Sequence, residues 1–105
     1  MKYVVFYDSA PNLETNAPPH LPAHIARWKQ FKERGELLMI GTFSNAQAEG
    51  SMAIFTTRAA AEAFVKDDPF VLHGVVQSWR IREWREVLWP ESAQAAPASD
   101  AVERT

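Results

Sequence analysis

The sequence predicts an α+β fold in which a four-stranded antiparallel sheet carries two helices on one face. Two observations predict it. Strand-like and helix-like segments follow one another in the order βαββαβ, and the first and third strand-like segments are apolar without alternation. That order is the ferredoxin-like arrangement, and uninterrupted apolar strands are typical of a sheet covered on both faces. With 105 residues, of which 47% are hydrophobic, the chain suffices for one such domain but not for two.

The first half of the chain predicts one strand and one helix. Residues 3–7, Tyr-Val-Val-Phe-Tyr, predict a buried strand, and residues 8–19 predict a loop because they contain proline, asparagine and serine. We expect a helix from Pro22 to Arg34, since proline suits the first helical turn and Gly35 can end the helix in a left-handed conformation. The apolar stripe of this helix comprises His24, Ile25, Trp28 and Phe31.

The second half of the chain predicts three strands and one helix. Strands are expected over residues 37–43, 51–56 and 75–84, with a polar turn over residues 44–50. Thr57 can cap a helix over residues 58–66, which turns Ala61, Phe64 and Val65 inward. The last strand alternates in polarity, with Val75, Trp79 and Ile81 on one face and Ser78, Arg80 and Arg82 on the other.

The composition excludes several classes of protein. The formal net charge is -2 and the charges are interspersed, which argues against a nucleic-acid binder. The chain has no cysteine, which excludes a disulfide scaffold and a thiolate metal site and suits a reducing cytoplasm. The sequence contains no run of about 18 apolar residues, so it predicts no membrane span. We expect no cofactor, because the sequence has neither a G-x-G-x-x-G nor a P-loop motif.

The domain is expected to span residues 1–88, and its sheet needs a partner. The first and third strands are apolar on both sides, but two helices can cover only one face of the sheet. A second copy of the chain, packed sheet against sheet, is the simplest cover, so we predict a homodimer. Residues 89–105 are rich in alanine, serine and proline and predict a C-terminal extension that is flexible or packs on a partner subunit.

Five segments together resemble the YciI-like, or YCII-related, family over residues 1 to 84. They are "PAHIARW" (Pro22–Trp28), "GTF" (Gly41–Phe43), "GSMAIF" (Gly50–Phe55), "AAAEAFVKDDPF" (Ala59–Phe70) and "WRIREW" (Trp79–Trp84). The resemblance implies a dimeric α+β barrel of ferredoxin-like subunits. It also implies an active-site pair formed by a histidine at the start of the first helix and an aspartate before proline, which His24 and Asp68 match. One branch of the family resembles dehydrochlorinases of chlorinated aromatic compounds.

The residues themselves leave two interpretations open for each member of this pair. His24 lies on an apolar helical stripe, where it is either a core residue or a base that titrates near neutral pH. Asp68 precedes Pro69 and is either an ordinary helix cap or the group that orients an imidazole and fixes its tautomer. The catalytic interpretation requires the His24 ring to lie within about 6 Å of the Asp68 carboxylate or to reach it through a water.

Four further residues are candidates for binding a substrate: Trp28, Phe70, His73 and Arg80. Trp28 can line a pocket for a flat ring. Arg80 either faces solvent or a dimer interface, or anchors an anionic group. His73 is either a turn residue or reaches the cleft. His20 and His24 have the spacing of two metal ligands on a helix, but Pro22 separates them, and we predict no metal site.

These expectations favour a small cofactor-independent enzyme of the lyase, isomerase or dehydrochlorinase type. His24 would move a proton and Asp68 would orient it, in a cleft that holds a small molecule. A dimeric domain that binds a metabolite without turnover is the main alternative. A relative of haem- or oxygen-dependent monooxygenases is a third.

Overall fold

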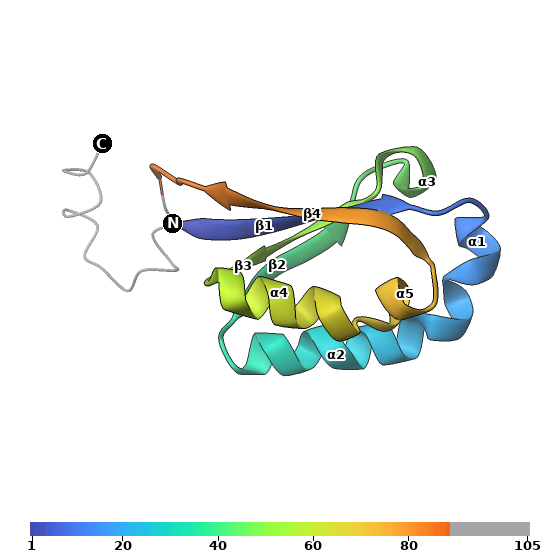
Figure 1. Ribbon diagram of the computed structural model, residues 1–105, viewed down its shortest axis with the longest axis horizontal. Helices are drawn as coiled ribbons and strands as arrows, with labels where there is room; N and C mark the ends of the chain where they lie inside the picture. The colour runs from blue at the N-terminus through green and yellow to red at the C-terminus, as the bar shows by residue number, and fades with distance from the viewer. Residues whose placement is uncertain (89–105) are drawn as a thin grey trace.

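The computed structural model describes residues 1–88, which form a sheet with its two long helices on one side (Figure 1). The elements are β1 (Lys2–Ser9), α1 (Leu13–Asn16), a 3-10 helix (Pro18–His20), α2 (Leu21–Glu33), β2 (Leu37–Thr42), α3 (Ala46–Glu49), β3 (Ser51–Phe55), α4 (Arg58–Asp67), α5 (Pro69–Leu72) and β4 (Val76–Trp84). The predicted C-terminal extension, residues 89–105, lies outside the described residues.

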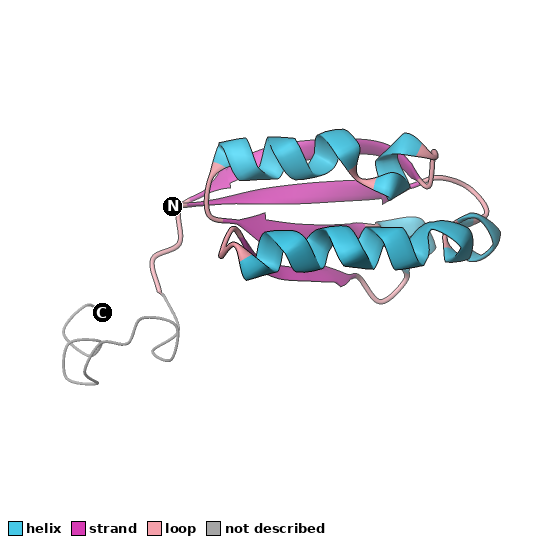
Figure 2. Cartoon of the chain, turned by 90° about the horizontal axis from the view of Figure 1, so that it is seen from below, coloured by secondary structure: helices cyan, strands magenta, loops and turns pink. Residues whose placement is uncertain are grey.

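The predicted ferredoxin-like topology is confirmed. The four strands pair antiparallel in the order β2-β3-β1-β4, and the helices α2 and α4 lie side by side on one face (Figure 2). In the centre of the sheet, Val5 of β1 pairs with Ala53 on one side and with Ile81 on the other. The two central strands are therefore the two that the sequence marks as apolar throughout.

The core lies between this face of the sheet and the two long helices. Phe55 of β3 and Phe64 of α4 are almost fully buried, and their ring centroids lie 5.2 Å apart. Phe31 of α2 packs edge-on against Phe64, also with centroids 5.2 Å apart. Burying a side chain of this size stabilises a fold by about 1.5–3 kcal/mol. The packing of Phe31, Phe55 and Phe64 against one another therefore contributes substantially to holding the two long helices on the sheet.

The predicted helix ends are confirmed. Gly35 follows α2 with a φ of 75°, a left-handed conformation that glycine adopts without a steric cost. The Thr57 hydroxyl accepts a hydrogen bond from the backbone N–H of Ala60, at 3.1 Å, and so caps α4.

Two segments differ from the sequence prediction. The expected loop over residues 8–19 contains α1 and the 3-10 helix, and the expected turn over residues 44–50 contains α3. For α3 and for the start of α1, the cause is hydrogen bonding by polar side chains. The Asn45 side chain accepts from the backbone N–H of Ala48 at the start of α3, and Gln47 bonds to the backbone of the first loop. Such side chains can end or start a helical turn, so their presence does not distinguish a loop from a capped short helix.

On the opposite face of the sheet the two central strands are apolar as well, whereas β4 carries Ser78, Arg80 and Arg82 there. Val4 and Ile54 pair across β1 and β3 on this face, next to Phe6 and Met52. Trp84 at its margin is 49% exposed. The predicted apolar character of both sides of β1 and β3 is therefore confirmed, while the dimer that would cover this face stays a prediction. None of the helices within residues 1–88 has the length and apolar character that crossing a bilayer requires.

One contact between β1 and β3 depends on a glycine. Gly50 has a φ of 77°, and a Cβ atom built on it would lie 1.9 Å from the Tyr7 carbonyl oxygen. We expect Gly50→Ala to lower the free energy of unfolding by at least about 2 kcal/mol, because the backbone must either shift or keep a strained conformation. Urea unfolding followed by circular dichroism measures this.

Gly41→Ala is the matched control, because a Cβ atom at Gly41 meets no atom within 4 Å and its φ is not positive. We expect this control to change the free energy of unfolding by less than about 1 kcal/mol. Equal effects of the two substitutions would contradict the importance of the close approach at Tyr7.

Candidate active site

Asp68 lies in the short link between α4 and α5. It has an extended backbone conformation, with φ -65° and ψ 125°, as expected for a residue before proline. This conformation ends α4 and turns the carboxylate back onto α5, where Oδ1 accepts a hydrogen bond from the backbone N–H of Phe70 at 3.2 Å. The capping interpretation of Asp68 is therefore confirmed as a geometric fact.

The same carboxylate is fully buried and accepts two further hydrogen bonds. His24 Nδ1 lies 2.7 Å from Oδ1, and the Tyr7 hydroxyl donates to Oδ2 at 2.6 Å. Burying a carboxylate is costly unless donors replace water at both oxygens. Asp68 thus caps a helix and contacts an imidazole at once, and the distance between the pair is well inside the 6 Å that the catalytic interpretation requires.

His24 is held in the first turns of α2 by ring contacts as well as by this bond. The Phe70 ring stacks on the imidazole at 4.0 Å between centroids and 7° between planes, and Phe64 meets it edge-on at 6.3 Å. When the Asp68 carboxylate is ionised it can only accept, so in that state Nδ1 carries the hydrogen and donates it to Asp68. The other ring nitrogen, Nε2, is then left to exchange a proton with a ligand.

A cavity of about 310 Å³ lies beside His24, between α2 and the β2–β3–β1 side of the sheet. It is lined by Val5, Tyr7, Leu21, His24, Ile25, Trp28, Ile40, Gly41, Thr42, Ser51, Met52, Ala53, Phe64 and Phe70. Most of these side chains are apolar, and the polar ones are the imidazole and three hydroxyls. A mainly apolar cavity with a few convergent polar groups is typical of a site for a small molecule.

The sequence-predicted residues divide into two groups. His24, Trp28 and Phe70 line this cavity, and Asp68 lies directly behind His24. Arg80 is elsewhere, on the helix-free face, 3.5 Å from the Asp8 carboxylate and over the Phe6 ring. The structure does not bring Arg80 to the cavity, because the register of β4 against β1 puts it opposite Phe6.

His73 also lies outside the cavity lining. It follows α5, and its ring stacks on His20 with centroids 4.1 Å apart and 5° between planes. His20 therefore contacts His73 and not His24, although the spacing of His20 and His24 in the sequence is that of two metal ligands on a helix. Within residues 1–88 no three histidine, aspartate or glutamate side chains gather as metal ligands would.

Tyr7 is the site residue that the sequence reasoning missed. It lies on β1 on the helix-covered face, next to Val5 in the core. Burial, and then the negative charge of Asp68, raise the pKa of its hydroxyl, so that the group stays protonated and donates. The available signal was its place at the end of an apolar strand, since a buried tyrosine hydroxyl needs a hydrogen-bond partner.

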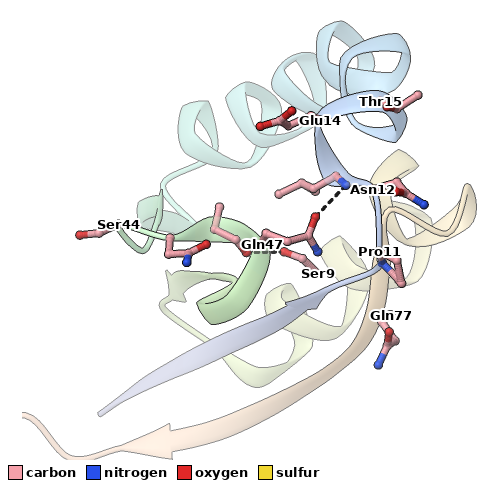
Figure 3. Close-up of a pocket in the computed structure, with 11 residues that line it drawn as sticks. Ser9, Pro11, Asn12, Glu14, Thr15, Ser44, Gln47 and Gln77 are labelled. Carbon is pink, nitrogen blue, oxygen red and sulfur yellow. Dashed lines mark hydrogen bonds between the residues drawn. The ribbon is translucent and has the colours of Figure 1, made fainter.

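A second, more polar cavity of about 840 Å³ lies at the end of β1, between α1 and α3 (Figure 3). Its polar side chains Ser9 and Gln47 form hydrogen bonds that join the segment after β1 to α3. Gln47 accepts a hydrogen bond from the backbone N–H of Leu13, and the Ser9 hydroxyl donates to the Ala46 carbonyl (Figure 3). Gln47 also donates to the Ala10 carbonyl. It contains no imidazole, so the smaller cavity beside His24 is the better candidate for acid–base chemistry.

Comparison with known proteins agrees with this fold. A family model described as "YCII-related domain" matches residues 1–85. Among solved structures, 5-chloro-2-hydroxyhydroquinone dehydrochlorinase (TftG) from Burkholderia phenoliruptrix AC1100, in complex with 2,5-dihydroxybenzoquinone, superimposes with a TM-score of 0.65. The two chains are 19% identical, and the match covers 81% of this chain and 94% of the other. No curated protein sequence matches.

The buried carboxylate should be far more important for stability than its neighbour in the sequence. We expect Asp68→Ala to lower the free energy of unfolding by about 3 kcal/mol or more, because it removes a cap and leaves two buried donors without an acceptor. The exposed Asp67 is the matched control, and we expect Asp67→Ala to stay within about 0.5 kcal/mol of the wild type. Urea unfolding of both variants measures the two changes in the free energy of unfolding. A small effect at Asp68 would contradict the hydrogen-bond network.

Proposed function

We propose that this chain, which belongs to the family of YCII-related domains, is a cofactor-independent enzyme that moves a proton on a small molecule. His24 is the acid–base group and Asp68 orients it. The observation that carries the proposal is the 2.7 Å contact between His24 Nδ1 and a fully buried carboxylate, at the wall of a cavity of ligand size.

In this proposal the reacting proton passes through His24 Nε2. The nitrogen lone pair takes a proton from an O–H or C–H group of the substrate, and the electron pair that is left forms a C=O or C=C bond. In an elimination, chloride or another leaving group departs with its own bonding pair. Asp68 Oδ1 keeps its hydrogen bond to Nδ1–H and stabilises the imidazolium that forms. Acid–base catalysis of this kind typically contributes about 10²–10⁴-fold to a rate.

The cavity favours a single ring with few polar substituents. Trp28 gives it a flat apolar wall, and the hydroxyls of Thr42 and Ser51 can bond to oxygen atoms on such a ring. The structural neighbour is a dehydrochlorinase in complex with a dihydroxybenzoquinone. That likeness supports elimination of HCl from a hydroxylated ring as the reaction to test first. Arg80 and His73 have no part in this proposed substrate site.

Turnover should depend on His24 and not on a neighbouring histidine. We expect His24→Gln to lower the rate of chloride release by about 10²–10⁴-fold, because glutamine cannot take up the proton. Chloride release from a panel of chlorinated hydroxyhydroquinones, starting with 5-chloro-2-hydroxyhydroquinone, measures this. His20→Gln is the matched control and should keep the wild-type rate, since His20 stacks on His73 outside the cavity lining.

Two outcomes would overturn the enzyme proposal. One is equal rates for the wild type and His24→Gln. The other is a wild-type chain that binds these rings but releases no chloride from any of them, which would favour the alternative, a dimeric domain that binds a metabolite without turnover.

We also propose that the protein works in the cytoplasm, since a chain without cysteine suits a reducing compartment. We further propose that two chains associate through the helix-free face. The support is an apolar row on that face, in which Phe6 and Met52 are partly exposed beside Val4 and Ile54, which the single chain already buries, and near Trp84, which is 49% exposed. Light scattering after size exclusion should give twice the mass of one chain at micromolar concentration.

Phe6→Glu should convert this dimer to a monomer, because it puts a charge in the middle of the apolar row. The control Leu72→Glu changes an exposed side chain on α5, which is 60% exposed, and should leave the mass unchanged. A monomeric wild type would refute the dimer.

A further inference from the structure

The proposed His24–Asp68 pair leaves the role of Tyr7 open. Asp68 Oδ1 already has two partners, the His24 ring and the backbone N–H of Phe70. Within residues 1–88, the hydrogen bond to Oδ2 comes from the Tyr7 hydroxyl alone, at 2.6 Å. Tyr7 is itself 7% exposed, so water does not compete freely for this oxygen. The Tyr7 hydroxyl therefore holds Oδ2 of the carboxylate whose Oδ1 contacts His24.

We propose that Tyr7 is a positioning residue that sets how readily His24 takes up a proton, by holding a hydroxyl hydrogen on Asp68 Oδ2. The proposal rests on the acid–base function proposed for His24, and it assigns the tuning of that base to a residue on β1.

The physical basis is competition for the charge of one carboxylate. An anion that accepts a strong hydrogen bond on one oxygen is less basic at the other. With Tyr7 bound, Asp68 orients the imidazole but stabilises the imidazolium less, and the neutral base form of His24 persists to lower pH. Without the hydroxyl, the full charge of Asp68 acts on Nδ1–H and favours the protonated ring.

Other ionisable groups near the pair come from three elements. Arg27 of α2 donates to the carbonyls of Ala63 and Phe64, and its positive charge acts on Tyr7 to lower the pKa of the hydroxyl. His20, at the end of the 3-10 helix, and His73, directly after α5, stack on each other. None of the three is changed in the variants below, so each contributes equally to the proteins that are compared.

The test follows His24 itself and needs no substrate. The chain has three histidines, so comparison with His24→Gln assigns the His24 ring signals in NMR spectra recorded against pH. In Tyr7→Phe the midpoint of the His24 titration should move upward by about half a pH unit or more, roughly a threefold change in the protonation equilibrium. Tyr3→Phe, on the same strand but with its hydroxyl at the Met1 sulfur atom, should leave the midpoint unchanged.

A second variant reverses the sign and keeps the shape of the side chain. The chain has two tyrosines, so in the Tyr3→Phe background Tyr7 is the remaining one and can be replaced uniformly by 3-fluorotyrosine. Fluorotyrosine is a more acidic phenol and a stronger donor to Oδ2. It should therefore move the His24 midpoint downward, opposite to Tyr7→Phe, and it stays informative if Tyr7→Phe does not fold.

The outcomes separate this proposal from the one on which it rests. Opposite shifts in the two variants support the positioning role, because a merely structural tyrosine would not produce them. Midpoints equal to that of the wild type, or shifts of the same sign, would overturn it even if His24→Gln abolishes chloride release. Conversely, full chloride release by His24→Gln would refute the acid–base function while leaving the NMR result for Tyr7 intact.

Discussion

The burial of the Asp68 carboxylate is the constraint that organises the rest of this molecule. A negative charge without access to water needs donors at both oxygens, and no single element of the chain supplies them. The donors come from α2, from α5 and from β1, with His24 at a sequence separation of 44 and Tyr7 at 61. The fold can bury this carboxylate with its hydrogen bonds only when α2, α5 and β1 are all packed in their final positions. The site and the packing of the domain therefore depend on the same contacts.

Local features of the chain deliver each partner to that point. Pro69 holds Asp68 in an extended conformation, which ends α4 and starts α5. Phe70 follows at once, and it gives both a backbone donor to the carboxylate and a ring that stacks on His24. On the sheet, Gly50 allows β3 to approach the Tyr7 carbonyl closely. A helix cap, an aromatic stack and a glycine contact thus belong to the packing around one imidazole that lines a cavity of ligand size.

The sequence predicts the fold better than it predicts the site. The order of elements, the cap at Thr57 and the stop at Gly35 depend on neighbours within a few residues, so they can be inferred from pattern alone. The pairing of His24 with Asp68 required the family resemblance in addition. Tyr7 could not be found in this way, because its role follows from a contact that only the three-dimensional arrangement creates. For Arg80, the alternation of β4 indicates which residues share its face but not that the cavity lies on the other one.

The tautomer of His24 is the most direct measurement of whether Asp68 orients a base toward the cavity. Nitrogen-15 NMR of the imidazole ring, at a pH where the ring is neutral, distinguishes a hydrogen on Nδ1 from one on Nε2. If the carboxylate accepts from Nδ1 as the 2.7 Å contact indicates, the hydrogen lies on Nδ1 and Nε2 has a free lone pair. A neutral ring with its hydrogen on Nε2 would contradict this, because Nε2 would then have no lone pair with which to act as a base.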